Sequence, residues 1–111
     1  MAFNNYTGGR FVIGRSNPVT FRMGPFMDEN DGKTVLTGLT ISNSDVRLSK
    51  NDGAFGAMAG AAAITHDENG WYVVTLASAD TGTNGNLLVA IHMTGALPVW
   101  RFFEVDSAAP A

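Results

Sequence analysis

The chain is poor in cysteine, in charge and in long apolar runs. None of its 111 residues is cysteine, which excludes a disulfide framework and a thiolate zinc site. Charged residues make up 15% of the chain, whereas an average soluble protein has about 25%. The polar surface must therefore come from Asn, Thr, Ser and Gly. Such a neutral surface favours a chain that lives in an assembly, although simple β-protein composition explains it equally well.

Concentrated positive charge is also absent. The net charge is −3 and there is no run of Lys or Arg, so binding to nucleic acid or to an anionic membrane lacks its electrostatic basis. The longest apolar stretch, residues 87–93, is far too short to span a bilayer. The first residues have neither a basic start nor an apolar core, which argues against a secretion signal. We therefore expect no nucleic-acid partner, no membrane partner and synthesis in a cytoplasm.

What the sequence does contain is a ladder of short apolar runs, each ended by a turn of Gly, Asn, Asp or Pro. Strands of this length and spacing are typical of two packed sheets, so the ladder predicts an all-β sandwich of about seven to nine short strands. A single domain is expected, with an arm at 1–9, the sandwich at 10–105 and a tail at 106–111. The expected strands are 10–15, 19–23, 38–42, 45–50, 71–77, 87–93 and 97–105.

Three segments need separate interpretation. Residues 87–93 are apolar on both faces, which predicts a central strand. Residues 53–63 are rich in both Ala, which favours helix, and Gly, which opposes it. We predict a strand, a turn near Gly60 and a second strand through His66, with a one-turn helix as the alternative. Residues 43–44 mark either a tight turn or a crossing between sheets.

Catalytic and metal-binding side chains are scarce. Of the two histidines, His66 precedes a turn and His92 lies in an expected strand, and neither belongs to a nucleophile motif. Both are interpreted as hydrogen-bonded structural residues. His66, Asp67 and Glu68 are consecutive, so on a strand or tight turn their side chains diverge and cannot converge on a metal alone. We expect no catalytic residue, no metal ligand and no cofactor, and hence a protein that is not an enzyme.

The loop at residues 80–85 is the nearest approach to a calcium-binding loop. It has no oxygen-bearing side chain at its third position, and Ile91 stands where a bidentate Glu belongs. Turn formation, in which Asn and Asp side chains bond their own backbone, is the better explanation.

Aromatic residues are the remaining lead to function. Trp100, Phe102 and Phe103 lie in one expected strand, and period-two alternation prevents all three from facing the core. If Phe103 faces inward, then Trp100 and Phe102 face outward, toward a partner or a covering arm; the reverse arrangement exposes Phe103. In the arm, Phe3 and Tyr6 should also dock, because burying a large apolar side chain gains roughly 1.5–3 kcal/mol. The predicted contact set is Phe3, Tyr6, Phe26, Met27, Trp100 and Phe102.

Three stretches of the sequence are distinctive. They are Asp31-Gly32-Lys33-Thr34 through Thr37-Gly38-Leu39-Thr40-Ile41-Ser42 to Asp45-Val46-Arg47-Leu48-Ser49-Lys50-Asn51, then Thr65-His66-Asp67-Glu68-Asn69-Gly70-Trp71-Tyr72, and Gly95-Ala96-Leu97-Pro98-Val99-Trp100. Together they resemble a family of small virion proteins of tailed bacteriophages and, more distantly, the N-terminal domain of phage baseplate upper proteins. The resemblance covers residues 19–105 and implies an immunoglobulin-like antiparallel β-sandwich without a catalytic motif.

The resemblance implies a non-enzymatic structural protein of a bacteriophage virion, made in the host cytoplasm and docked on other virion proteins of the tail, baseplate or capsid. A homo-oligomer is expected. Longer members of the family continue into fibre-like segments, which favours a tail or fibre-base adaptor. Capsid decoration on the phage head is the alternative. A further alternative is a carbohydrate-binding module that stacks sugars on Trp71, Tyr72 or Trp100, and a small hydrolase is the least supported reading.

Overall fold

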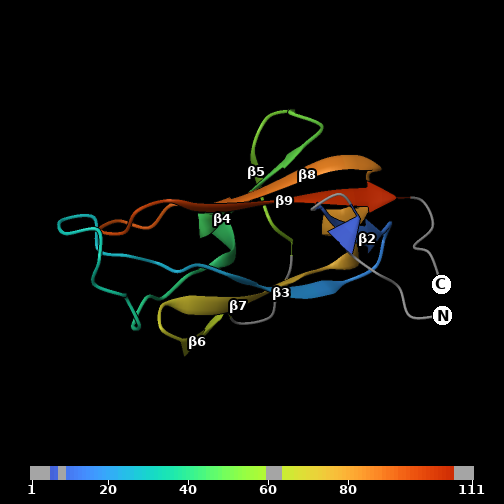
Figure 1. Cartoon of the computed structure of the whole chain (residues 1–111). Helices are drawn as coiled ribbons and strands as arrows, with labels where there is room; N and C mark the ends of the chain where they lie inside the picture. Colours follow the sequence, from blue (N-terminus) through green and yellow to red (C-terminus); the bar gives the residue numbers. More distant parts are fainter. Residues whose placement is uncertain (1–5, 8–9, 60–63, 107–111) are drawn as a thin grey trace.

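The chain folds into two β-sheets packed face to face (Figure 1). A computed structural model describes residues 6–7, 10–59 and 64–106. The larger sheet contains β1 (Tyr6–Thr7), β2 (Arg10–Gly14), β4 (Val46–Lys50), β5 (Gly56–Ala57), β8 (Gly85–Ile91) and β9 (Val99–Asp106). The smaller sheet contains β3 (Val19–Met23), β6 (Thr65–Glu68) and β7 (Trp71–Leu76). Two short 3₁₀ helices, η1 (Asn43–Asp45) and η2 (Ser78–Thr81), precede β4 and β8.

The strand order is that of an immunoglobulin-like sandwich, as predicted. The larger sheet runs β1-β2-β9-β8-β4-β5, and the smaller one runs β3-β7-β6. The run β9-β8-β4-β5 corresponds to G-F-C-C′ of an immunoglobulin domain, and β3-β7-β6 corresponds to B-E-D. The predicted central position of residues 87–93 is confirmed, because β8 lies between β9 and β4.

The pairing of β2 with β9 is parallel, whereas the other strand pairs of the described chain are antiparallel. The chain leaves β2 for β3 in the opposite sheet, so β2 forms no hairpin with its successor. It instead lies along the edge of the last strand, and a parallel pair of this kind requires a long connection, here nearly the whole domain.

The core lies between the two sheets and follows the predicted alternation. Three alternate residues of β7 are fully buried and meet three alternate residues of β8 and two of β9. Each such side chain contributes roughly 1.5–3 kcal/mol through removal of apolar surface from water. These residues are Tyr72, Val74 and Leu76; Leu87, Val89 and Ile91; and Phe103 and Val105.

The strand predicted at residues 38–42 is wrong, because this segment has no regular structure. It belongs to the long connection that carries the chain from β3 to β4, seen at the left of Figure 1. The buried hydroxyl of Tyr72 donates to the carbonyl of Leu36 at 2.7 Å and accepts the amide of Leu39 at 3.1 Å. A side chain thus replaces a strand partner for these backbone groups, and the alternating burial of Leu39 and Ile41 arises without a ladder.

Residues 43–44 form part of η1 and mark a crossing between sheets, not a hairpin turn. The carboxylate of Asp45 accepts a hydrogen bond from the amide of Ser42 at 2.9 Å and so caps the N-terminal end of this short helix. Farther along the chain, residues 53–59 contain only the two-residue strand β5, without a helix, while residues 60–63 lie outside the described part.

The predicted arm is described only at Tyr6–Thr7, where the backbone pairs with β2 as β1. Phe3 lies outside the described residues, as does 107–111 of the predicted tail; Asp106 still belongs to β9. Within the described ranges, the helices are all too short to cross a membrane.

Candidate functional site

The predicted contact residues do not form one surface. Trp100 and Phe102 are exposed, at 61% and 52% of their surface, while Met27 is half-buried. Phe26 is fully buried, with its ring edge-on to Tyr72 at 5.1 Å, so its assignment to a contact surface is wrong. Its backbone amide and carbonyl also bond to neighbouring segments, which holds it in the core. Phe3 and the side chain of Tyr6 lie outside the described residues.

Trp100 and Phe102 lie on the outer face of the larger sheet, which is one of the two arrangements that the alternation of β9 allowed. Trp100 stands opposite Ala90 of β8, and Phe102 stands opposite Leu88, both of which are half-buried. Arg47 of β4 is the next residue across the sheet from Ala90. We call these five residues the outer face.

A second feature is a surface hollow where the end of β3 meets the start of β9. Three adjoining depressions make it up, two of about 350 Å³ and one of about 210 Å³. Both tryptophans of the chain line it, and Trp71 is 38% exposed. Tyr72 is fully buried, so its assignment as a stacking residue is wrong. We call the site the tryptophan hollow, lined by Arg22, Met23, Gly24, Pro25, Asp67, Glu68, Trp71, Pro98, Val99, Trp100 and Arg101.

The position of Trp71 depends on Gly24. Gly24 has φ +150°, and a Cβ at this residue would lie 2.8 Å from the carbonyl oxygen of Gly70 and 3.0 Å from Cα of Trp71. The same Cβ would lie 3.3 Å from Cδ2 of the indole. Because only glycine permits this close approach, the backbone after β3 supports the wall of the tryptophan hollow.

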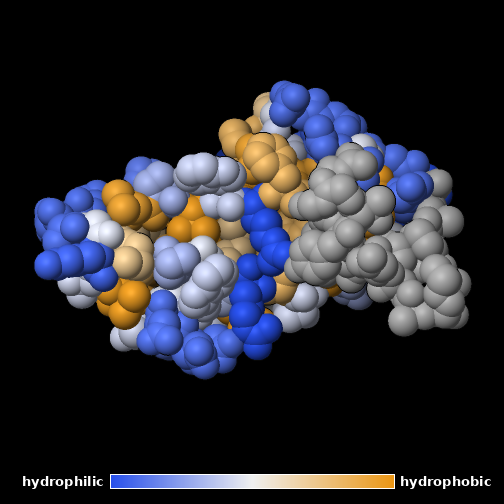
Figure 2. Space-filling model, viewed as in Figure 1, coloured by the Kyte–Doolittle hydropathy of each residue, from blue (hydrophilic) through white to orange (hydrophobic). Residues whose placement is uncertain are grey.

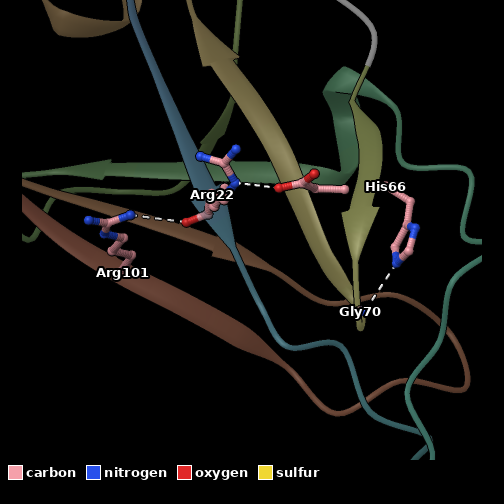
Figure 3. Close-up of polar contacts among 5 residues, drawn as sticks. Arg22, His66, Gly70 and Arg101 are labelled. Carbon is pink, nitrogen blue, oxygen red and sulfur yellow. Dashed lines mark hydrogen bonds and ion pairs between the residues drawn. The ribbon is translucent and has the colours of Figure 1, made fainter.

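A chain of polar contacts crosses the tryptophan hollow (Figure 3). Nη1 of Arg101 on β9 donates to the carbonyl oxygen of Arg22 on β3 at 3.0 Å. Nε of Arg22 in turn donates to Oδ2 of Asp67 on β6 at 2.6 Å. The hydrogen bond to Asp67, and secondly its charge, raise the pKa of Arg22. The contacts connect the two sheets at the surface.

Arg101 also has an apolar neighbourhood. Its guanidinium carbon lies 5.1 Å from the ring centre of Phe103 and 5.8 Å from that of Phe21. These rings lie 4.6 Å apart and belong to opposite sheets. The cation–π contacts hold Arg101 across the end of the core. In the space-filling view, strongly hydrophilic surface forms a band across the middle of the molecule, bordered by paler and apolar surface (Figure 2).

Neither histidine lines the tryptophan hollow. Nε2 of His66 accepts the amide of Gly70 at 3.1 Å, and the ring lies edge-on to Tyr72, so the prediction of a hydrogen-bonded structural residue is confirmed for His66. His92 is exposed. Across residues 6–7, 10–59 and 64–106, no three His, Asp or Glu side chains come together in a way that could hold a metal ion.

The loop at 80–85 begins with two buried polar residues, Asp80 and Thr81, whose side chains form hydrogen bonds with the backbone. The two carboxylate oxygens of Asp80 accept the amides of Ala59, at 2.7 Å, and Ala77, at 3.0 Å. The buried hydroxyl of Thr81 donates to the carbonyl of Asn17 at 2.7 Å. Asp80 and Thr81 together therefore bond the backbone of three segments.

The sequence analysis named Trp71 and Trp100 as separate candidates for sugar stacking. It did not predict that both line one hollow with Arg22 and Arg101. The packing of the two sheets brings these four residues together, and no motif in the sequence indicates their proximity.

No protein-family model, curated protein or solved structure matches this chain.

Proposed function

We propose that this protein is a non-enzymatic structural component of a bacteriophage virion that docks on another virion protein through its outer face. The observation that carries the proposal is the exposure of Trp100 and Phe102 side by side on one sheet face. The sequence resemblance to small tailed-phage virion proteins supplies the class of partner.

The outer face suits docking because it combines large apolar side chains with few charges. Leu88 and Ala90 continue the apolar surface beside the two rings, and Arg47 lies at the far side of the same row. Tryptophan and phenylalanine are enriched at the centres of protein interfaces, where they supply most of the binding free energy. A stable contact would require the partner to cover both rings.

Within the virion, a tail or fibre-base adaptor is the favoured position, following the longer family members that the sequence resembles. Decoration of the capsid is the competing position. The two differ in stoichiometry, because a decoration protein accompanies many capsid subunits, whereas an adaptor is present in few copies per particle.

The test is quantitative mass spectrometry of purified virions of the phage that encodes this chain. A few copies per particle would support the adaptor, and a copy number near that of the major capsid protein would support decoration. Absence from the particle would overturn the virion role.

A complementary test replaces Phe102 by Ala and measures incorporation into particles. Phe102 is half-exposed and lies outside the tryptophan hollow, so the substitution should leave folding intact. We expect incorporation to fall about 10-fold or more, the effect of an interface anchor. Thr20→Ala, an exposed change on β3 in the smaller sheet, is the matched control and should incorporate normally. Normal incorporation of Phe102→Ala would exclude the outer face as the docking surface.

A further inference from the structure

We propose that the tryptophan hollow binds a neutral saccharide, with a sugar ring packed on the indoles and its hydroxyls bonded to the surrounding arginine and carboxylate groups. This site shares Trp100 with the outer face but differs from it in composition, because it is lined by charged residues of three strands. The inference does not depend on the virion role.

The apolar part of the site comes from the two indoles. Trp71 on β7 and Trp100 on β9 belong to different sheets, yet both line the same depression. Both indoles are partly exposed, and the backbone at Gly24 runs so close to Trp71 that no room is left for a Cβ. The face of an indole is electron-rich and attracts the polarised C–H groups of one side of a sugar ring. The indoles therefore provide a stacking surface that exists before any ligand arrives.

The polar part of the site retains hydrogen-bonding capacity. A guanidinium has five N–H donors and an ionised carboxylate accepts about four hydrogen bonds. Arg22 uses Nε on Oδ2 of Asp67, and within the described chain neither side chain has another hydrogen-bond partner. The pair is open to solvent, with 61% and 36% of the two side chains exposed. Adjacent sugar hydroxyls, which donate and accept, match a guanidinium beside a carboxylate.

The balance of charge selects a neutral ligand. Two cationic side chains, Arg22 and Arg101, face two acidic ones, Asp67 and Glu68, around the same depression. An anion would meet the two carboxylates and a cation would meet the two arginines, and such like-charge contacts are costly. A volume of about 350 Å³ lies at the small end of ligand pockets, which span roughly 300–1,000 Å³. A short stretch of a neutral sugar chain meets these conditions.

The chain carries its own reporter for this site. Its two tryptophans, Trp71 and Trp100, both line the tryptophan hollow, so a ligand bound there should change tryptophan emission. Trp100 also belongs to the outer face, whereas Trp71 does not, so the emission of Trp71 in Trp100→Ala separates the two surfaces. The experiment titrates the full chain with cellotetraose, maltotetraose, xylotetraose and chitotetraose, and in parallel with tetragalacturonate and tetra-alanine. We expect a saturable shift of emission with at least one of the neutral sugars. The absence of any saturable change up to about 10 mM, beyond the range of weak specific binding, would overturn the inference.

Three variants locate the binding. Trp71→Ala and Trp100→Ala each leave one tryptophan as reporter and should weaken the best sugar about 10-fold or more. Asp67→Ala, at an exposed side chain, should weaken it comparably without affecting folding. Phe102→Ala removes an equally exposed ring outside the tryptophan hollow and should keep the affinity within about 2-fold. Thermal denaturation of each variant confirms that it is folded.

The remaining outcomes are also decisive. Saturation by tetragalacturonate or tetra-alanine, without saturation by a neutral sugar, would show that the ligand class is wrong. Equal losses for Phe102→Ala and Trp71→Ala would show that the site is misplaced. Loss of virion incorporation in Phe102→Ala with an unchanged sugar titration would support both proposals, because Phe102 belongs to the outer face and lies outside the tryptophan hollow.

Discussion

Two polar clusters in this sandwich use the same chemistry in opposite surroundings. Asp80 is buried, and each of its carboxylate oxygens accepts a backbone amide. Asp67 is exposed, with 36% of its side chain open to solvent, and its Oδ2 accepts Nε of Arg22. A buried carboxylate with internal partners holds segments of backbone together, because losing it leaves amides without an acceptor. An exposed pair adds little stability and keeps its capacity for a ligand.

The largest expected effect comes from breaking the buried cluster. Asp80→Ala leaves the amides of Ala59 and Ala77 without an acceptor, and each such loss costs about 1–3 kcal/mol. We expect the free energy of unfolding to fall by about 2–4 kcal/mol, measured by urea denaturation. Glu29→Ala, at an exposed carboxylate, is the control and should change it by less than about 0.5 kcal/mol. An unchanged urea midpoint for Asp80→Ala would show that the two hydrogen bonds of Asp80 contribute nothing to the stability of the fold.

The contacts between Asn51 and the start of β8 should be sensitive to a side chain added at Gly85. Gly85 has φ +114°, and a Cβ there would lie 1.9 Å from Oδ1 of Asn51. That side chain accepts the amide of Asn86 and donates to the carbonyl of Asn84, both at 3.0 Å. Gly85→Ala should therefore cost about 2–3 kcal/mol of unfolding free energy, from backbone strain and displacement of Asn51.

A double-mutant cycle separates the two causes. In an Asn51→Ala background the added methyl meets no amide, so the cost of Gly85→Ala should fall and only the strain of the positive φ remains. Equal costs in both backgrounds would contradict the proposed collision.

A third carboxylate combines an exposed position with internal partners. The hydroxyl of Thr34, and then the amides of Lys33 and Thr34, bond Asp31 and lower its pKa from the ordinary value of 3.8. A lowered pKa stabilises the fold above that ordinary value, and the contribution is lost as the pH falls through the folded-state pKa. Asp31→Asn should therefore make stability less dependent on pH in this acidic range. Thr34→Val should return the pKa of Asp31, followed by NMR, toward 3.8; an unchanged pKa would contradict the role of the hydroxyl.

The smallest effect on stability is expected at the open cluster. Asp67→Ala removes the partner of Arg22, but both side chains lie at the surface, so the urea midpoint should stay within experimental error of the unsubstituted protein. The same variant should lose sugar affinity. If Asp67→Ala lowered the stability as much as Asp80→Ala, the proposed difference in stability between the exposed and the buried cluster would be wrong.

Much of the fold could be predicted because alternation along a strand reports which side chains face the core. It grouped the side chains of β7 and of β8 by face and left two directions open for Trp100 and Phe102, of which the burial of Phe103 selects the outward one. The segment at 38–42 shows the limit of this signal, because its alternating burial is supported by the hydroxyl of Tyr72 in place of a neighbouring strand. Phe26 shows the same limit, since it lies in a connection whose path depends on Gly70 and Leu36.

The sequence by itself determined the all-β class, most strand positions and which side chains of a strand share a face, because these depend on neighbours along the chain. Only the tertiary structure decided that Trp71 and Trp100 line one hollow with Arg22, Asp67 and Arg101. These residues come from β3, β6, β7 and β9, and their proximity follows from how the two sheets pack at that edge. Contacts between residues so far apart in the chain leave no local pattern, because the packing of the whole core sets them.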